Sequence, residues 1–325
     1  MTGDREQAIR IISPIHWDTD AFLMLRERLL ATAESLPFEA RLRFVVVDDS
    51  AGTDPAIERL ESLPDVEVIR PPFNLGHQRA IVFALRRVAP SLDDDEIVVT
   101  MDSDGEDQPE DLPRLIAPLT CSGASRHIIA FALRTKRRET LAFKLFYAGF
   151  RLFFRTLTGE VVRTGNYAAY RGWLTKQIIG HPYFDMSYSA TLISLQVPRE
   201  MVPCERGERY AGQSSMNLGR LVMHGLGMLM PFTDRIAVRA LVSFTLTIVL
   251  AAVAALAVLG VRLFTDAAVP GWATYTLLFL LILSFVALGN FVVLFAVFSQ
   301  TRAMSFANLH ATFDGRTRES PDPAE

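Results

Sequence analysis

Short apolar runs and amphipathic segments alternate through the first 135 residues. Apolar runs at 8–14, 42–49, 66–70, 96–101 and 127–133 have the length and composition of buried strands. Between them, residues 19–35, 55–63, 76–88 and 110–119 carry apolar side chains at helical spacing. This alternation is typical of a mostly parallel sheet with helices on both faces. The expected fold class is therefore α/β, with a Rossmann-like sheet domain.

The pattern becomes irregular after residue 134. It predicts a basic helix at 134–155, a hairpin around 161–171 and two further strands at 190–195 and 199–203. Residues 216–232 are small or apolar with few charges, but they are too short and too interrupted to cross a bilayer. Such a segment is typical of a helix that lies at the membrane interface.

Two long apolar segments follow. Residues 240–261 and 273–299 contain 22 and 27 residues without a charged side chain, and each exceeds the roughly 20 residues needed to span a membrane. Two buried core helices are the alternative. The connecting loop has one basic residue, Arg262, whereas Arg235 and Arg239 precede the first segment. The positive-inside rule therefore places the large N-terminal portion and the C-terminal tail in the cytoplasm. The expected divisions are a sheet domain at 1–215, an interfacial segment at 216–235, a two-helix transmembrane hairpin at 236–300 and a partly disordered tail at 301–325.

An acidic stretch directly follows the apolar run at 96–101. Six of the ten residues from 102 to 111 are acidic. In open α/β sheets, ligands bind beyond the carboxyl ends of the strands, so Asp102 and Asp104 are candidate ligands of a hard cation, Mg²⁺ or Mn²⁺. Such ions complete their shells with substrate phosphates, which predicts a phosphate-bearing substrate. Asp107, Glu110 and Asp111 are expected to form a solvated helix start. A wholly solvated acidic loop is the alternative.

Composition and charge add two points. The net charge of −3 says little about partners, but residues 134–155 hold seven basic residues against one acid, interleaved with aromatic residues. Because an apolar hairpin is expected nearby, this helix is expected to bind anionic lipid and not nucleic acid; an ordinary amphipathic core helix is the alternative. The two cysteines, Cys121 and Cys204, have no metal-site spacing and are expected to be reduced.

Several motifs occur in a characteristic order. They are a strand ending at Pro14, the pair Asp48 and Asp49, an Asn-x-Gly-His-Gln at 74–78, the Asp-x-Asp at 102–104 and an Arg-x-x-Gly-x-Ser at 209–214. This series resembles the family 2, GT-A type glycosyltransferases. Within them it resembles the polyprenyl-phosphate sugar transferases, such as dolichol-phosphate mannose synthase and the bacterial undecaprenyl-phosphate glucosyltransferases with two C-terminal membrane helices. The likeness runs from about residue 9 to about residue 299.

The resemblance implies roles for individual residues. It implies that Asp49 contacts the donor nucleotide in a pocket shaped by Pro14 and Asp48, and that Asp102 and Asp104 hold the cation at the donor diphosphate. Glu106 stands where relatives have a glutamine ligand, so it is a third candidate metal ligand. The resemblance further places Arg209 on the donor diphosphate, as a catalytic residue with Asp102 and Asp104, and Arg134 and Lys144 on the acceptor phosphate.

The implied activity is inverting transfer of a sugar from a nucleotide-sugar, such as UDP-glucose, to a polyprenyl phosphate. The implied location is a bacterial plasma (inner) membrane, in a multi-pass protein that could form a homo-oligomer. The chain departs from the family pattern at His16, Trp17, Asn166 and Ser215, which bears on nucleotide and sugar choice. Another lipid or glycan acceptor and a non-catalytic nucleotide- or lipid-binding membrane scaffold are alternatives. A processive polysaccharide synthase is disfavoured, because the chain lacks a Gln-x-x-Arg-Trp motif.

Overall fold

The structure is a computed structural model. It describes residues 6–120, 127–134, 141–161, 164–205, 207, 209–210, 218–265 and 271–317. The described chain divides into two compact units. One comprises the chain up to Phe154 together with Glu160–Pro231, and the other comprises Arg155–Gly159 together with the chain from Phe232 onward.

The first unit is built on a seven-stranded sheet with the order β3-β2-β1-β4-β6-β5-β7. The strands are β1 (Gln7–Ile15), β2 (Ala40–Asp48), β3 (Val66–Ile69), β4 (Ile97–Thr100), β5 (Ile129–Arg134), β6 (Thr164–Arg171) and β7 (Arg199–Cys204). Strands β1 to β4 are parallel, and so are β5 and β7, whereas β6 runs antiparallel between β4 and β5. The predicted α/β class with a mostly parallel, GT-A-like sheet is confirmed.

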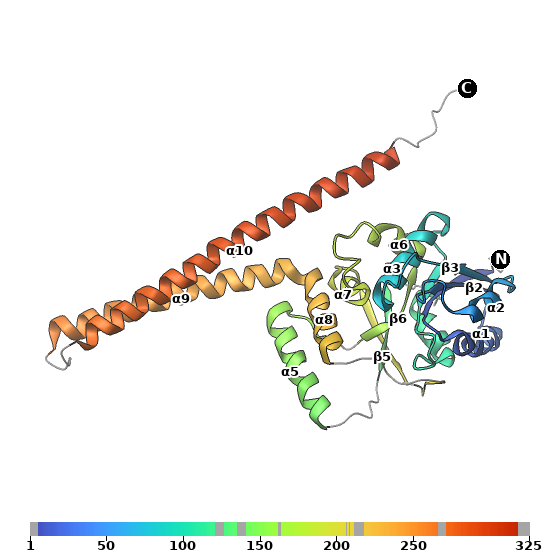
Figure 1. Cartoon of the computed structure of the whole chain (residues 1–325), viewed down its shortest axis with the longest axis horizontal. Coiled ribbons are helices and arrows are strands. Elements are labelled where there is room, and N and C mark those ends of the chain that lie inside the picture. Colours follow the sequence, from blue (N-terminus) through green and yellow to red (C-terminus); the bar gives the residue numbers. More distant parts are fainter. Residues whose placement is uncertain are drawn as a thin grey trace. The chain divides into compact units, whose positions relative to one another are not determined.

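Helices cover both faces of this sheet (Figure 1). Helices α1 (Thr19–Glu34) and α4 (Leu112–Thr120) contact one face, and α3 (His77–Val88), α6 (Gly172–Ile178) and α7 (Tyr188–Ser194) contact the other. The connections between these strands and helices also contain the short helix α2 (Glu58–Glu61) and the 3₁₀ turns η1 (Pro55–Ile57), η2 (Ala89–Ser91) and η3 (Pro109–Asp111). The apolar core lies between α1, α4 and the sheet, where the rings of Phe22 and Phe44 meet edge to face with centroids 6.0 Å apart.

Two local predictions differ from the structure. The segment expected to be a hairpin contributes one strand, β6, whose antiparallel partners β4 and β5 lie far away in the sequence. The strand predicted at 190–195 is wrong, because residues 188–194 form helix α7, which Ser187 caps by accepting a hydrogen bond from the backbone N–H of Ala190. Nearly every side chain of α7 is buried. A short apolar run of this kind cannot be assigned to strand or helix by its periodicity.

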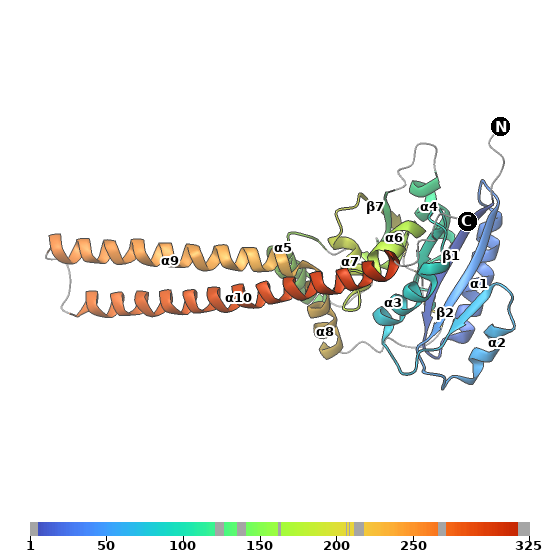
Figure 2. The same cartoon turned by 90° about the horizontal axis from the view of Figure 1, so that it is seen from above.

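The remaining elements are helical. They are α5 (Leu141–Thr158), α8 (Leu218–Leu229), the turn η4 (Met230–Phe232), α9 (Thr233–Phe264) and α10 (Trp272–Thr317). Helices α9 and α10 run side by side in opposite directions (Figure 2). Helix α10 continues through much of the segment expected to be a tail.

Helices α9 and α10 contain the two predicted apolar segments. The spans Val222–Phe264 and Trp272–Val297 are long and apolar enough to cross a membrane, and only 11% and 6% of their apolar windows are buried. Large apolar side chains face outward, as with Leu256 at 69% exposure and Phe285 at 67%. Exposed apolar surface of this extent fits hydrocarbon better than water, and it argues against two buried core helices. Both helices are candidate membrane spans.

Candidate active site

The acidic turn after β4 is held by its own carboxylates. The backbone N–H of Asp102 donates to Oδ2 of Asp107 (3.0 Å), and the backbone N–H of Glu106 donates to Oδ1 of Asp104 (3.0 Å). Gly105 between them has φ +88°, a left-handed conformation that glycine adopts without strain. The chain therefore folds back on itself just beyond the strand.

Two acids expected to be solvated are buried instead. Asp107 and Asp111 are only 2% and 3% exposed, whereas Glu110 is an exposed residue. Asp107 caps the backbone of Asp102, and Asp111 accepts from the backbone N–H of Glu205 (3.1 Å). The prediction of a solvated helix start is thus wrong for these two residues. Both carboxylates therefore stabilise the backbone at and around the turn.

Arg209 reaches the turn from a distant part of the chain. Its Nη2 lies 3.0 Å from Oδ2 of Asp104, and its Nε donates to Oε1 of Glu106 at 2.8 Å. Burial and the neighbouring Asp102 carboxylate raise the pKa of Asp104, and the positive charge of Arg209 opposes this shift. The structure therefore brings Asp102, Asp104, Glu106 and Arg209 together at the carboxyl end of β4.

Two polar residues outside the predicted site also contact Asp102. Nε2 of His77, the first residue of α3, lies 2.8 Å from Oδ1 of Asp102, and Nδ2 of Asn166 on β6 donates to the same oxygen at 3.3 Å. Burial disfavours the charged imidazole, but the carboxylates of Asp102, Asp104 and Asp107 outweigh it and raise the pKa of His77. His77 belongs to the Asn-x-Gly-His-Gln motif, which was the one signal in the sequence for this contact.

The acids of the turn fit a divalent cation in part. Within the described ranges no group of three or more His, Cys, Asp or Glu side chains is placed to hold a metal ion. Arg209 pairs with both Glu106 and Asp104, and Asp104 also lies near the charge of Asp102. Mg²⁺ commonly binds through only one or two carboxylates together with substrate phosphates, so two acids are enough. A cation would oppose both the burial and the repulsion by Asp102 that raise the pKa of Asp104. Glu106 as a third ligand stays a prediction.

The expected nucleotide pocket lies where β1 and β2 end. Asp48 accepts from the backbone N–H and hydroxyl of Ser50 (3.0 and 2.5 Å) and from the N–H of Gly52 (3.2 Å), so its carboxylate shapes its own turn. Oδ1 of Asp49 accepts from the backbone N–H groups of Leu75 (2.6 Å) and Gly76 (3.2 Å). Burial raises the pKa of Asp49, and these N–H groups oppose the shift.

Pro14 connects this pocket to the acidic turn. Its carbonyl accepts a hydrogen bond from the hydroxyl of Ser103 at 3.1 Å, and Ser103 stands between Asp102 and Asp104. The carboxyl ends of β1 and β4 are therefore tied together, as expected for neighbouring parallel strands. Pro14, Asp48 and Asp49 as nucleotide contacts stay predictions.

The predicted acceptor residues lie at the limit of what the structure describes. Arg134 is the last residue of β5 and Lys144 lies in the first turns of α5. Their side chains, like the segment 135–140 between the two elements, lie outside the described part of the chain. Their role in binding acceptor phosphate stays a prediction.

The sheet and the turn have a counterpart among known families. Residues 22–177 match the model described as Glycosyl transferase family 2. These residues form a family 2 glycosyltransferase domain. The matched segment contains Asp48, Asp49, Asp102 and Asp104, whereas Pro14 and Arg209 fall outside it. The expected enzyme class, a glycosyltransferase, is confirmed.

Comparison with solved structures gives remote likenesses. The chain is similar to mannosyl-3-phosphoglycerate synthase from Rubrobacter xylanophilus (17% identity, TM-score 0.48, covering 70% of this chain and 74% of that one). It is also similar to residues 1–349 of S. aureus TarS in complex with UDP-GlcNAc (16%, 0.41, 72% and 67%) and to a 4-diphosphocytidyl-2C-methyl-D-erythritol synthase (14%, 0.39, 67% and 100%). At these values the likeness carries no argument about substrate. A comparison with curated proteins gave no match.

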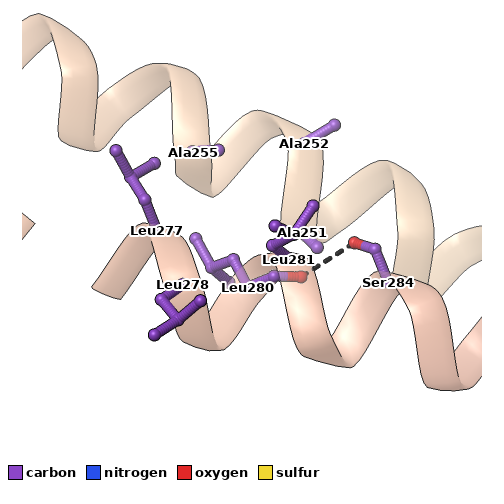
Figure 3. A pocket seen from close by; sticks show the side chains of 8 residues that line it. All are labelled: Ala251, Ala252, Ala255, Leu277, Leu278, Leu280, Leu281 and Ser284. Carbon is purple, nitrogen blue, oxygen red and sulfur yellow. Dashed lines mark hydrogen bonds between the residues drawn. The ribbon is translucent and has the colours of Figure 1, made fainter. Parts of the chain in front are cut away.

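The groove between α9 and α10 offers no second polar site. It is lined by Ala251, Ala252, Ala255, Leu277, Leu278, Leu280, Leu281 and Ser284 (Figure 3). The hydroxyl of Ser284, the one polar side chain in this lining, donates to the carbonyl of Leu280 at 2.9 Å. The groove therefore suits apolar groups. A phosphate group would find no charged partner among these residues.

Proposed function

We propose that this glycosyltransferase transfers a sugar from a nucleotide-sugar, such as a UDP-linked hexose, to a polyprenyl phosphate at the cytoplasmic face of a membrane. One observation carries the proposal: Asp102, Asp104 and Arg209 meet at the carboxyl end of β4, a strand of the segment that matches family 2. Acids and a guanidinium in one place suit a substrate that brings a diphosphate and a divalent cation together.

Each part of the donor can be assigned to particular residues of the site. The base of the nucleotide would lie at Asp49, and its diphosphate would lie over the acidic turn, within reach of Arg209. When bound, Mg²⁺ or Mn²⁺ held by Asp102 and Asp104 would neutralise diphosphate charge. The Arg209 guanidinium would stabilise the negative charge that grows on the departing nucleoside diphosphate.

The acceptor side of the site supports an acceptor that arrives as an anion. Asn166 is 9% exposed and lies beside Asp102, and a carboxamide cannot take up a proton as a general base. A phosphate monoester has a second pKa of roughly 6 and is already a nucleophile near neutrality. Its oxygen would bond to the anomeric carbon as the bond to the diphosphate breaks and the electron pair leaves with the diphosphate. Attack from the opposite side inverts the configuration.

The C-terminal helices support a lipid-linked acceptor. Helices α9 and α10 are candidate membrane spans, and the basic segment at 134–155 supplies charges that can attract anionic headgroups and the acceptor phosphate. The proposed location is the plasma (inner) membrane, with the family 2 domain on the cytoplasmic side, where nucleotide-sugars are available.

A reconstituted assay tests the proposal. Purified full-length protein in detergent is supplied with undecaprenyl phosphate, Mg²⁺ or Mn²⁺ and single nucleotide-sugars from a panel, and lipids are analysed by mass spectrometry. The expected result is a sugar-bearing lipid phosphate with at least one donor, and none with the Asp102→Asn variant. Absence of a sugar-bearing lipid phosphate with every donor of the panel would refute the lipid-phosphate assignment.

A further inference from the structure

Arg28 on α1 makes an unusual number of contacts for a partly exposed residue. Its guanidinium binds Glu110 with two hydrogen bonds, Nε to Oε1 at 2.9 Å and Nη2 to Oε2 at 2.6 Å. Nη2 also donates to Oε1 of Gln108 at 3.0 Å, and Nη1 donates to the hydroxyl of Tyr210. The guanidinium carbon lies 5.6 Å from the centroid of the Tyr210 ring, within range of a cation–π interaction. One side chain thus joins three segments of the chain.

Tyr210 is itself seated on the acidic turn. Its backbone N–H donates to the carbonyl of Asp104 at 2.9 Å, and the N–H of Gly207 donates to the carbonyl of Glu106 at 2.9 Å. The Tyr210 ring packs on Gly105, where an added Cβ would lie 2.8 Å from ring atoms. These contacts fix the backbone on both sides of Arg209 against the turn that carries Asp104 and Glu106.

The backbone contacts alone are few, and they lie at a partly exposed edge. Two hydrogen bonds at such an edge open readily, because backbone bonds near solvent are among the least stable of a fold. Arg28, which is held on one helix, adds a bidentate ion pair, two further hydrogen bonds and a ring contact. Its planar fork can satisfy the Glu110 carboxylate and the Tyr210 hydroxyl together, which the single ammonium of lysine cannot.

We propose that Arg28 is a positioning residue: it clamps Tyr210 to the Asp104–Glu106 turn and so holds the Arg209 guanidinium where the donor diphosphate binds. The structure shows the contacts of Arg28. Their effect on binding of the donor diphosphate rests on the proposed function. Arg28 itself touches no predicted donor residue among the described contacts; its partners are Glu110, Gln108 and Tyr210. Its effect on catalysis passes through Arg209.

The same helix supplies a matched control. Arg26 binds Asp65 with two hydrogen bonds (Nε to Oδ2 at 2.9 Å, Nη2 to Oδ1 at 2.6 Å) and lies 5.9 Å from the ring of Phe44. It therefore makes the same kinds of contact as Arg28, but its partner Asp65 lies between α2 and β3, away from the acidic turn. Replacing Arg26 therefore measures the general effect of losing a bidentate arginine from α1, separate from any effect on the acidic turn.

Hydrogen exchange of the full chain in detergent tests the clamp directly, without any substrate. In Arg28→Gln, we expect the amides of Gly207 and Tyr210 to exchange about tenfold faster or more, while the amides of β4 stay protected. In Arg26→Gln, we expect no change at Gly207 and Tyr210. Unchanged exchange in Arg28→Gln, or equal acceleration in both variants, would overturn the proposal. If Arg28→Gln does not fold, Tyr210→Phe decides, since it removes only the hydroxyl contact. It should still accelerate exchange at Gly207, and unchanged exchange there would overturn the proposal.

Kinetics add a second readout once a donor is known. Arg28→Gln should lower kcat/KM for the donor by about ten- to a hundredfold, as expected for a displaced catalytic group, and leave the acceptor KM unchanged. Arg28→Lys should recover only part of this loss. Equal losses for donor and acceptor would indicate general damage and overturn the positioning role. A wild-type protein without any transfer activity would instead refute the proposed function, and the exchange experiment would still decide on the clamp.

Discussion

Nε2 of His77 lies 2.8 Å from Oδ1 of Asp102, so the start of α3 touches the first carboxylate of the acidic turn. Asn166 on β6 joins the same pair, with its Nδ2 2.6 Å from the His77 ring nitrogen. Asp102 is therefore oriented from two other elements before any ligand binds. A carboxylate held in this way has less conformational freedom to lose when it takes up a cation or a sugar hydroxyl.

The acids of the turn can be tested by neutral, isosteric substitution. Asp102→Asn and Asp104→Asn should each lower kcat by on the order of 10²-fold or more, because each removes a carboxylate ligand of the cation that would neutralise the charge on the departing diphosphate. Steady-state turnover at saturating Mg²⁺ or Mn²⁺ measures the effect.

Asp94→Asn is the matched control for these variants. Asp94 lies just before the opposite end of β4, and its exposed carboxylate pairs with Lys176 at 2.8 Å. This variant should keep full activity. Full activity in both Asp102→Asn and Asp104→Asn would contradict the cation-binding role of the turn.

The predicted acceptor residues should separate acceptor from donor binding. Arg134→Gln or Lys144→Gln removes a charge-assisted hydrogen bond worth about 1.5–3 kcal/mol, so the acceptor KM should rise about ten- to a hundredfold with donor affinity unchanged. Arg151→Gln, which lies further along α5 than Lys144, should have a smaller effect that fades as salt is added. Equal weakening of donor and acceptor by Arg134→Gln would show a structural role for that residue.

The membrane hairpin predicts which loops an impermeant reagent can reach. In a cysteine-free background, a cysteine introduced at position 268 should be labelled on intact cells, because this loop is expected on the outer side. A cysteine at position 324 should be labelled only after the cells are opened. The reverse pattern would place the family 2 domain away from cytoplasmic nucleotide-sugars and contradict the proposed location.

A buried ion pair between β1 and the start of β4 gives a stability test that is independent of function. Nε of Arg10 on β1 lies 2.8 Å from Oε1 of Glu96, and their side chains are only 7% and 4% exposed. Arg10→Met leaves the Glu96 carboxylate buried without its partner, so we expect a loss of about 3–5 kcal/mol of unfolding free energy. The double variant Arg10→Met/Glu96→Leu should recover most of this loss in a denaturation experiment. A single variant as stable as the wild type would contradict the assignment.

The order and type of most elements follow from local sequence patterns. Apolar runs of five to eight residues alternate with amphipathic segments, and the strands β1 to β4 and helices α1 and α3 begin and end within two residues of the predicted positions. Local patterns suffice there, because β1, β2 and β4 are buried along most of their length and the helices bury one face. The apolar segments in α9 and α10 were also evident, since a long uncharged run has few other uses.

Local patterns do not show which distant side chains meet, because these contacts depend on the tertiary fold. The antiparallel insertion of β6 between β4 and β5 brings Asn166 to Asp102, and no local pattern encodes a pairing partner. Arg28 and Tyr210 are 182 positions apart, yet they share a hydrogen bond over the acidic turn. The burial of Asp107 was likewise hidden, because an acid that caps a backbone N–H and one that faces water look the same in sequence. Local patterns fix the strands and helices, whereas long-range packing fixes the partners of each charge.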